Sequence, residues 1–164
     1  MGDEPVLPYQ RPPLSKAYLS GEQEQEKLLL RAAAFYEKQN IEVKTSTSVT
    51  EINPQNSTIR IDDREDLSFE HLLIATGSRV RKINVSGSEL NNIHYLRTIE
   101  DVDQIRSGMA KDKKLVIVGG GYVGLEVAAI ATQAGMNVRV LETEDRVLQR
   151  VTTPTMSNYY TRLH

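Results

Sequence analysis

The chain has 164 residues and a formal net charge of −2, from 20 Lys and Arg against 22 Asp and Glu. Charged residues make up 26% and hydrophobic residues 39%, a balance typical of a globular protein rather than a disordered one. The basic residues are scattered, and no apolar run approaches the roughly 20 residues of a membrane helix. We therefore expect neither nucleic acid nor a membrane as a partner.

Cysteine is absent from the sequence, and the three histidines lie far apart. These facts exclude disulfide bonds, cysteine–zinc sites and a redox-active dithiol within this chain, and they give a histidine metal site little support. The N-terminus lacks the basic start and apolar core of a signal peptide, so we expect a cytoplasmic protein without a metal site.

The first half of the chain is predicted to pass from an extended segment through one helix to a group of strands. Prolines make residues 1–19 extended and non-helical. Ser20 with Gln23 resembles a capping box, and apolar residues at helical spacing predict a helix over 22–39. Residues 41–77 are interpreted as a strand-rich unit with an antiparallel meander. Its strands are expected at 41–45, 48–52, 58–61, 67–69 and 72–75, with a turn at 53–56 and the last strand buried.

The second half is predicted to hold a βαβ unit after a linker and a short helix. Residues 78–96 are polar and rich in Asn, Ser and Gly, and Thr98 with Asp101 marks the start of a helix over 98–106. The apolar, β-branched run at 115–118 predicts a parallel strand covered on both faces. The elements expected next are a helix over 122–134 closed by Gly135, a strand at 137–141 and a helix within 153–164.

A glycine-rich turn between the apolar strand and the Ala-rich helix carries the strongest chemical signal. Gly119, Gly121 and Gly124 fit the pattern G-x-G-x-x-G, and Glu142, which ends the next strand, comes 23 residues after Gly119. This strand–turn–helix–strand–acid context is what indicates a dinucleotide-binding motif. The alternative is a glycine turn that only packs a βαβ unit.

Each of these residue types has a physical role. Gly119 permits the tight turn, Gly121 lets a pyrophosphate approach the backbone, and Gly124 allows helix and strand to pack closely. The helix N-terminus offers N–H groups and partial positive charge to phosphates. Glu142 can accept hydrogen bonds from both hydroxyls of an adenosine ribose. A 2′-phosphate would meet Glu142 together with Glu144, with no adjacent Arg in the turn, so NADH is favoured over NADPH.

Several segments together resemble one known family. They are Leu115–Glu126, Val140-Leu141-Glu142, Arg146–Val151, the loop from Gly2 to Lys16, Ala75-Thr76-Gly77 and Tyr95-Leu96-Arg97. In this order they are similar to the FAD-dependent ferredoxin reductases of the putidaredoxin reductase and biphenyl-dioxygenase reductase type. These belong to the pyridine nucleotide-disulfide oxidoreductase superfamily, in which apoptosis-inducing-factor-like and nitrite-reductase-associated proteins share the same motifs. The resemblance implies an α/β fold with two Rossmann-like dinucleotide-binding domains and an antiparallel β-meander.

The resemblance also implies that this chain is part of a longer molecule. The family's N-terminal strand and first G-x-G-x-x-G, which hold the FAD diphosphate, have no counterpart here, and neither do its C-terminal flavin segment and interface domain. We therefore expect an internal fragment or the product of a truncated gene. Residues 1–108 are then a partial FAD-binding domain that lacks its first βαβ unit. Residues 109–164 are the first βαβ unit of an NAD-binding domain.

The activity that the resemblance implies is hydride transfer from NADH to FAD, followed by delivery of electrons to a ferredoxin-type iron–sulfur protein. Related disulfide reductases carry a cysteine pair just before the lysine equivalent to Lys16. Because no thiol is present here, one-electron carriers are favoured over dithiol exchange. Two alternatives stay open: a non-catalytic module that senses NADH through residues 113–150, and an inactive truncated product that folds poorly.

Lys16 and Glu126 are the catalytic candidates that the resemblance implies. Lys16 resembles the family's lysine near the reactive edge of the flavin, and Glu126 resembles the glutamate that faces the same site. We predict an ion pair between them that links the two domains. Tyr122 resembles an aromatic that covers the flavin and swings aside for nicotinamide. The alternatives are solvated charges for the ion pair and ordinary helix packing for Tyr122.

The remaining cofactor-binding candidates also follow from the resemblance. Those expected at FAD are Arg11, Arg97, Val49, Ala75, Thr76 and Gly77, and those expected beside the NADH adenosine are Thr143 and Arg150. Val49 is alternatively a strand core residue, and Gly77 is alternatively only the end of a strand. Arg146 is expected to pack or pair locally.

Overall fold

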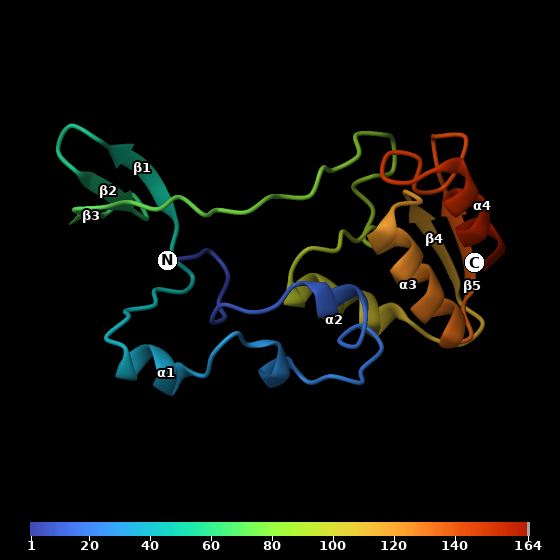
Figure 1. Ribbon diagram of the computed structural model, residues 1–164, viewed down its shortest axis with the longest axis horizontal. Coiled ribbons are helices and arrows are strands. Elements are labelled where there is room, and N and C mark those ends of the chain that lie inside the picture. The colour runs from blue at the N-terminus through green and yellow to red at the C-terminus, as the bar shows by residue number, and fades with distance from the viewer. Residues whose placement is uncertain (164) are drawn as a thin grey trace. The chain divides into compact units, whose positions relative to one another are not determined.

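The computed structural model describes residues 1–163, which form two compact units (Figure 1). The first unit contains residues 1–10 and 28–79, and the second contains residues 11–27 and those from Val80 onward. The first holds an antiparallel sheet of three strands, and the second holds a parallel pair of strands with helices. The predicted α/β class with a meander is therefore confirmed. The predicted division near residue 108 between two cofactor domains stays a prediction.

The sheet of the first unit is the predicted meander. Its strands are β1 (Val49–Asn53), β2 (Thr58–Ile61) and β3 (Glu65–Ser68), paired in that order. The turn between β1 and β2 forms as the Asn-Pro-Gln-Asn sequence predicts, since Asn56 N–H donates to Asn53 Oδ1 at 3.1 Å.

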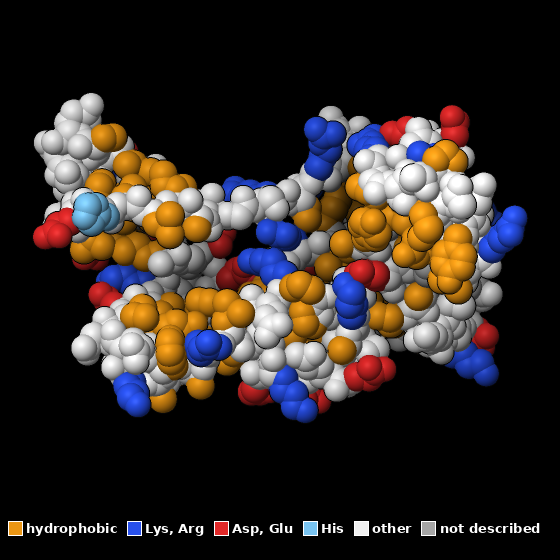
Figure 2. Space-filling model, in the orientation of Figure 1, with side chains coloured by type: hydrophobic (Ala, Val, Ile, Leu, Met, Phe, Trp, Pro, Cys, Tyr) orange, Lys and Arg blue, Asp and Glu red, His pale blue; other side chains and the backbone are white. Residues whose placement is uncertain are grey.

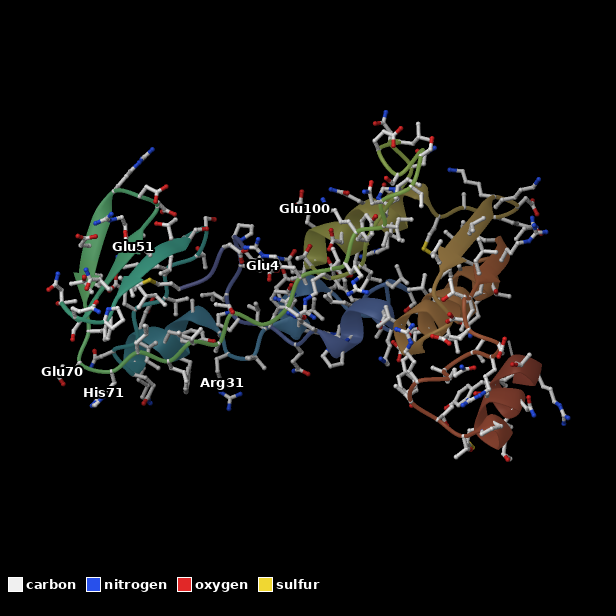
Figure 3. The ribbon with its side chains drawn as sticks, turned by 90° about the horizontal axis from the view of Figure 1, so that it is seen from above. Glu4, Arg31, Glu51, Glu70, His71 and Glu100 are labelled. Atoms are coloured by element: carbon white, nitrogen blue, oxygen red, sulfur yellow. The ribbon has the colours of Figure 1, made fainter. Side chains whose placement is uncertain are left out.

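Side chains on the two faces of β2 hold this sheet together. Ile59 and Ile61 are buried on one face. On the other face, Arg60 donates to Glu51 Oε2 at 2.9 Å and to Asp66 Oδ1 at 3.0 Å, and so joins all three strands (Glu51 is labelled in Figure 3). These ion pairs are exposed, so the buried isoleucines contribute more to stability.

The predicted continuous helix over 22–39 is wrong. The 3₁₀ turn η2 covers Gln25–Leu28, and helix α1 covers only Ala33–Lys38. The chain between them is extended and pairs with the N-terminal segment, where Leu30 N–H donates to Pro8 C=O at 2.9 Å. These tertiary hydrogen bonds override the helical spacing of the apolar residues.

The N-terminal segment also differs from the prediction. Residues 1–19 are not extended throughout, because Pro12–Ser15 form the 3₁₀ helix η1 with Pro at its first positions. The predicted Ser20 cap is wrong as well, since Ser20 Oγ donates to Ala17 C=O at 3.2 Å.

Two predicted strands do not form. Residues 41–45 make irregular backbone bonds to the N-terminus, including Gly2 N–H to Lys44 C=O at 3.0 Å, but no regular strand. Residues 72–75 are neither a strand nor buried, and Leu73 is 88% exposed. An apolar run becomes a buried strand only beside partner strands, and the described residues provide none at this segment.

The second unit contains the predicted βαβ arrangement. Strand β4 (Lys114–Val118) leads into helix α3 (Tyr122–Gln133), and strand β5 (Asn137–Leu141) pairs with β4 in parallel. Figure 1 shows α3 lying against the two strands. Gly135 adopts φ 78° after the end of the helix, as expected of a C-terminal cap.

The strand pair is covered on one face only. Leu125, Ala128 and Ala131 of α3 are buried. On β4, Val116 and Val118 are 56% and 62% exposed, so the prediction that this strand is covered on both faces is wrong. Figure 2 shows that hydrophobic side chains, in orange, are exposed on the face of the molecule turned to the viewer.

Two further helices complete the second unit. Helix α2 (Ile99–Gly108) begins with the predicted cap, since Thr98 Oγ1 accepts from Asp101 N–H and Asp101 Oδ2 accepts from Thr98 N–H. Helix α4 (Pro154–Leu163) confirms the predicted C-terminal helix, while His164 lies outside the described residues. Within residues 1–163, no helix has the length and apolar character needed to cross a membrane.

Candidate functional site

The glycine-rich turn after β4 has the conformation that its sequence predicts. Gly119 adopts φ 110°, which side-chain-bearing residues rarely adopt, and its N–H donates to Leu141 C=O at 2.8 Å. A Cβ on Gly124 would lie 2.1 Å from the Gly119 carbonyl oxygen. The conformational roles of Gly119 and Gly124 are therefore confirmed, because only a glycine at position 124 lets α3 approach the turn this closely.

The space at the start of α3 suits an anionic ligand. Gly121 is the N-cap residue of α3, and apart from its two neighbours in the chain no described residue has a heavy atom within 4 Å of the position that its Cβ would take. The first N–H groups of a helix have no acceptor within the helix, and the helix dipole favours negative charge there. The turn thus offers both room and donors for a phosphate group.

Glu142, at the end of β5, is bonded to the same turn. Its Oε1 accepts from Glu144 N–H at 3.0 Å and Thr143 N–H at 2.7 Å, and its Oε2 accepts from Gly120 N–H at 2.7 Å. The bonds from Glu144 and Gly120 are the main reason that the pKa of Glu142 lies below its usual value. Among the described residues, Oε2 accepts only from Gly120, so Oε2 is the oxygen with room to accept from a ribose hydroxyl.

The loop after β5 changes one argument made from the sequence. Arg150 Nη2 lies 2.7 Å from Glu144 Oε1, and this contact raises the pKa of Arg150. Arg150 therefore neutralises the negative charge of Glu144, so Glu144 would repel a 2′-phosphate less than the sequence suggested. The predicted preference for NADH over NADPH therefore rests mainly on Glu142 and stays a prediction.

The same loop is anchored at two points, one at Leu148 and one at Arg146. Leu148 is 2% exposed, and its N–H donates to Gly120 C=O at 2.9 Å. Arg146 donates to Thr152 C=O at 3.0 Å and to the fully buried Ser157 Oγ of α4. The local pairing expected for Arg146 is confirmed. The anchoring roles of Leu148 and Ser157 were not predicted, because they depend on which groups the folded loop brings near these residues.

The predicted ion pair between Lys16 and Glu126 is present. Lys16 Nζ lies 2.7 Å from Glu126 Oε1, and the two side chains are 52% and 29% exposed. Ser15 Oγ donates to the other carboxylate oxygen, Oε2. Lys16 Nζ also contacts Pro12 C=O at 3.3 Å. The pair joins η1 to α3 within the second unit, and its place between two cofactor domains stays a prediction.

Two more contacts hold residues 11–27 against the rest of the second unit. Tyr18 OH donates to Asp103 Oδ1 at 2.8 Å, and burial together with Asp103 raises the pKa of Tyr18 to about 12. Arg11 Nη1 donates to Arg97 C=O at 2.8 Å, so two of the predicted flavin contacts lie together. Arg97 Nε is buried without a hydrogen-bond partner among the described residues. Such an unsatisfied donor fits a site that receives an oxygen-rich ligand.

The other flavin candidates belong to the first unit or to the surface. Val49 is 43% exposed on β1, so the alternative of a strand core residue is wrong. Residues 75–77 are exposed and irregular, and Gly77 adopts φ 70°. Tyr122 is 53% exposed at the start of α3. Flavin contact by any of these residues stays a prediction.

Comparison with known proteins agrees with this geometry. Residues 1–164 match the pyridine nucleotide-disulphide oxidoreductase family. The chain belongs to this family. It is 45% identical to putidaredoxin reductase of Pseudomonas putida over 167 residues, and 40% identical to rhodocoxin reductase of Rhodococcus erythropolis over 164 residues. Each alignment covers 100% of this chain but only 40% and 38% of the relative, so the chain spans less than half the length of these relatives.

Solved structures show the same likeness. The reductase in the covalent putidaredoxin reductase–putidaredoxin complex superimposes with a TM-score of 0.96 at 45% identity, over 99% of this chain and 40% of that one. A ferredoxin reductase of Rhodopseudomonas palustris gives a TM-score of 0.94 at 37% identity, again over 99% of this chain and 40% of that one. The resemblance inferred from the sequence motifs is confirmed.

Gly124→Ala is expected to destabilise the fold by about 1–3 kcal/mol, because the added Cβ overlaps the Gly119 carbonyl and the backbone must move. The measurement is urea-induced unfolding followed by circular dichroism. Gly121→Ala is the matched control, and its open surroundings predict a change within about 0.5 kcal/mol. Equal losses in the two variants would contradict the close packing at Gly124.

The lowered pKa of Glu142 predicts a stability that depends on pH. The folded-state pKa lies below the unfolded value, so the stabilisation is complete above the unfolded pKa and is lost as the pH falls through the folded pKa. Between about pH 5 and about pH 3, wild-type stability should fall more steeply than that of Glu142→Gln, whose amide does not ionise. Urea unfolding at a series of pH values tests this. Parallel pH profiles would show that Glu142 is not the source.

Proposed function

We propose that this chain is part of an FAD-dependent oxidoreductase that takes a hydride from NADH and passes electrons to a ferredoxin-type iron–sulfur protein. The observation that carries the proposal is that α3 holds two features at once. Its N-terminus forms the open glycine turn, and Glu126 on the same helix binds Lys16 at 2.7 Å. Helix α3 thus carries both a phosphate-binding turn and the carboxylate that contacts the accessible cation of Lys16, as transfer between two bound cofactors requires.

The names of the relatives support the choice of electron acceptor. Relatives of this chain are named putidaredoxin reductase and probable ferredoxin reductase, and one solved structure is a covalent complex of putidaredoxin reductase with putidaredoxin. The absence of cysteine from the chain agrees with an acceptor other than a dithiol. We extend the same acceptor class, a small iron–sulfur protein, to this chain.

The residues around the glycine turn fit NADH. The open space at Gly121 accepts the pyrophosphate, and Glu142 Oε2 accepts a hydrogen bond from the adenosine ribose. Thr143 and Arg150, on the loop that follows, are proposed to flank the adenosine. When bound, NADH would supply the hydride, and FAD would take up its two electrons and its proton, so that the electrons can leave one at a time while the proton is released to solvent.

The residues around Arg97 fit one side of FAD. The unsatisfied Nε of Arg97, with Arg11 bonded to the same residue, provides donors for phosphate or ring oxygens. Val49 and residues 75–77 are proposed to line the flavin. Tyr122 is proposed to cover the ring until nicotinamide enters.

Lys16 is proposed to act through its charge. Its ammonium lies in a partly exposed position, held by Glu126 and Pro12, where a ligand can reach it. A fixed cation stabilises negative charge that develops next to it during hydride transfer. Contacts with Glu126 Oε1 and Pro12 C=O keep the ammonium close to α3 and η1, so the charge is present before the reaction begins.

A second candidate function is an NADH-sensing module without catalysis. The features that fit NADH all lie within the second unit, whereas Val49 and residues 75–77 are exposed in the first. Purified protein that is yellow supports the oxidoreductase, because bound flavin absorbs visible light. Colourless folded protein that binds NADH supports the sensing module. Insoluble protein supports an inactive truncated product, for which the exposed side chains of Leu73 and Val118 provide a reason.

Glu142→Ala is expected to weaken NADH binding by about tenfold, because a bond from the ribose to a charged carboxylate is lost. The measurement is isothermal titration calorimetry with NADH and NADPH. Glu51→Ala is the matched control, since it removes the same charged group from the exposed sheet of the first unit. Wild-type protein that shows no saturable NADH signal, or equal affinity of Glu142→Ala and wild type, would contradict the proposed site.

Lys16→Met is expected to slow flavin reduction by NADH about tenfold or more, because the fixed positive charge is removed while most of the side-chain volume stays. Stopped-flow absorbance of the flavin-loaded protein measures the rate. Lys44→Met is the matched control, because Lys44 pairs with Glu42 in the first unit. A rate unchanged from wild type would remove Lys16 from the mechanism.

A further inference from the structure

We infer that Ser15 is a positioning residue, which orients the Glu126 carboxylate and through it the Lys16 ammonium. Ser15 Oγ donates to Glu126 Oε2, while Lys16 Nζ contacts Glu126 Oε1 at 2.7 Å. Two adjacent residues of the chain therefore bind the two oxygens of one carboxylate. The inference rests on the proposed function, since the site that Ser15 orders is the proposed redox site.

The ion pair alone does not define one geometry. Lys16 is 52% exposed, and an exposed lysine–carboxylate pair gains little energy and keeps many side-chain rotamers. Ser15 is 4% exposed, so its hydroxyl has few alternative partners and little competition from water. A second bond in a buried position restricts rotation of the carboxylate, which then fixes where the ammonium lies.

The short helix η1 explains why Ser15 and Lys16 reach the same group. Pro12 and Ser15 are the first and last residues of η1, and Lys16 Nζ also contacts Pro12 C=O at 3.3 Å. The ammonium is thus bonded on one side by the backbone of η1 and on the other by Glu126. Ser15, at the end of η1, completes the arrangement by binding the remaining oxygen of Glu126.

Other contacts attach residues 11–27 to the rest of the second unit independently of Ser15. Tyr18 donates to Asp103 on α2, and Arg11 donates to Arg97 C=O. Loss of the Ser15 hydroxyl therefore leaves the segment in place and removes only one of the bonds to Glu126. We therefore expect loss of the Ser15 hydroxyl to affect the reaction selectively and to leave the structure of the segment intact.

The test uses the flavin-loaded, full-length protein that carries this chain. Ser15→Ala is expected to slow flavin reduction by NADH about tenfold while leaving the NADH dissociation constant within about twofold of wild type. Ser15→Thr, which keeps a hydroxyl, is expected to retain most of the rate. Ser20→Ala is the matched control, because Ser20 lies in the same segment and its hydroxyl donates to Ala17 C=O rather than to Glu126. Its rate should equal that of wild type.

A double-mutant cycle with Glu126→Ala identifies the route of the effect. If Ser15 acts through Glu126, Ser15→Ala changes the rate less than about twofold when Glu126→Ala is already present. A crystal structure of Ser15→Ala should show Glu126 in more than one rotamer. Equal effects of Ser15→Ala in both backgrounds, or a single ordered Glu126, would overturn the role of Ser15. No flavin reduction in any variant, wild type included, would instead overturn the proposed function and this role with it.

Discussion

The close approach of α3 to the end of β4 is the constraint on which the candidate site depends. The Gly119 carbonyl occupies the space where a side chain at Gly124 would lie. This packing aims the N-terminus of α3 at the open turn and places Glu126, two residues beyond Gly124, against Lys16 at 2.7 Å. One helix therefore fixes the spacing between the proposed phosphate site and the proposed catalytic cation.

Within the glycine motif, the residue with a structural role differs from the residue proposed to bind the ligand. Both backbone polar groups of Gly120 are hydrogen-bonded within the protein, since its N–H donates to Glu142 and its C=O accepts from Leu148 N–H. Gly121 faces open space. The loop after β5 thus rigidifies one peptide of the turn while the next remains available, and a preformed turn binds a ligand with less loss of conformational entropy.

The sequence predicted those elements whose signals are local. The strand at 137–141, the Thr98 cap and the conformation of Gly119 all depend on a few neighbouring residues, and all are confirmed. The predictions of a helix over 22–39 and a strand at 72–75 are wrong, because the conformation of these segments depends on distant partner segments.

In the candidate site, too, the sequence predicted the features that depend on local spacing and missed those that depend on distant residues. The glycine turn and Glu142 were predicted from spacing, but Lys16 and Glu126 were proposed only through a family resemblance. Ser15 was missed because its partner lies 111 residues away along the chain. The hydrogen bond from Arg146 to Ser157 on α4 also joins segments that are separate in the sequence, and it has a practical consequence. The shortest piece of this chain that we expect to keep the proposed nucleotide site extends past Ser157, because a shorter piece lacks the residue that anchors Arg146 in the loop that rigidifies Gly120.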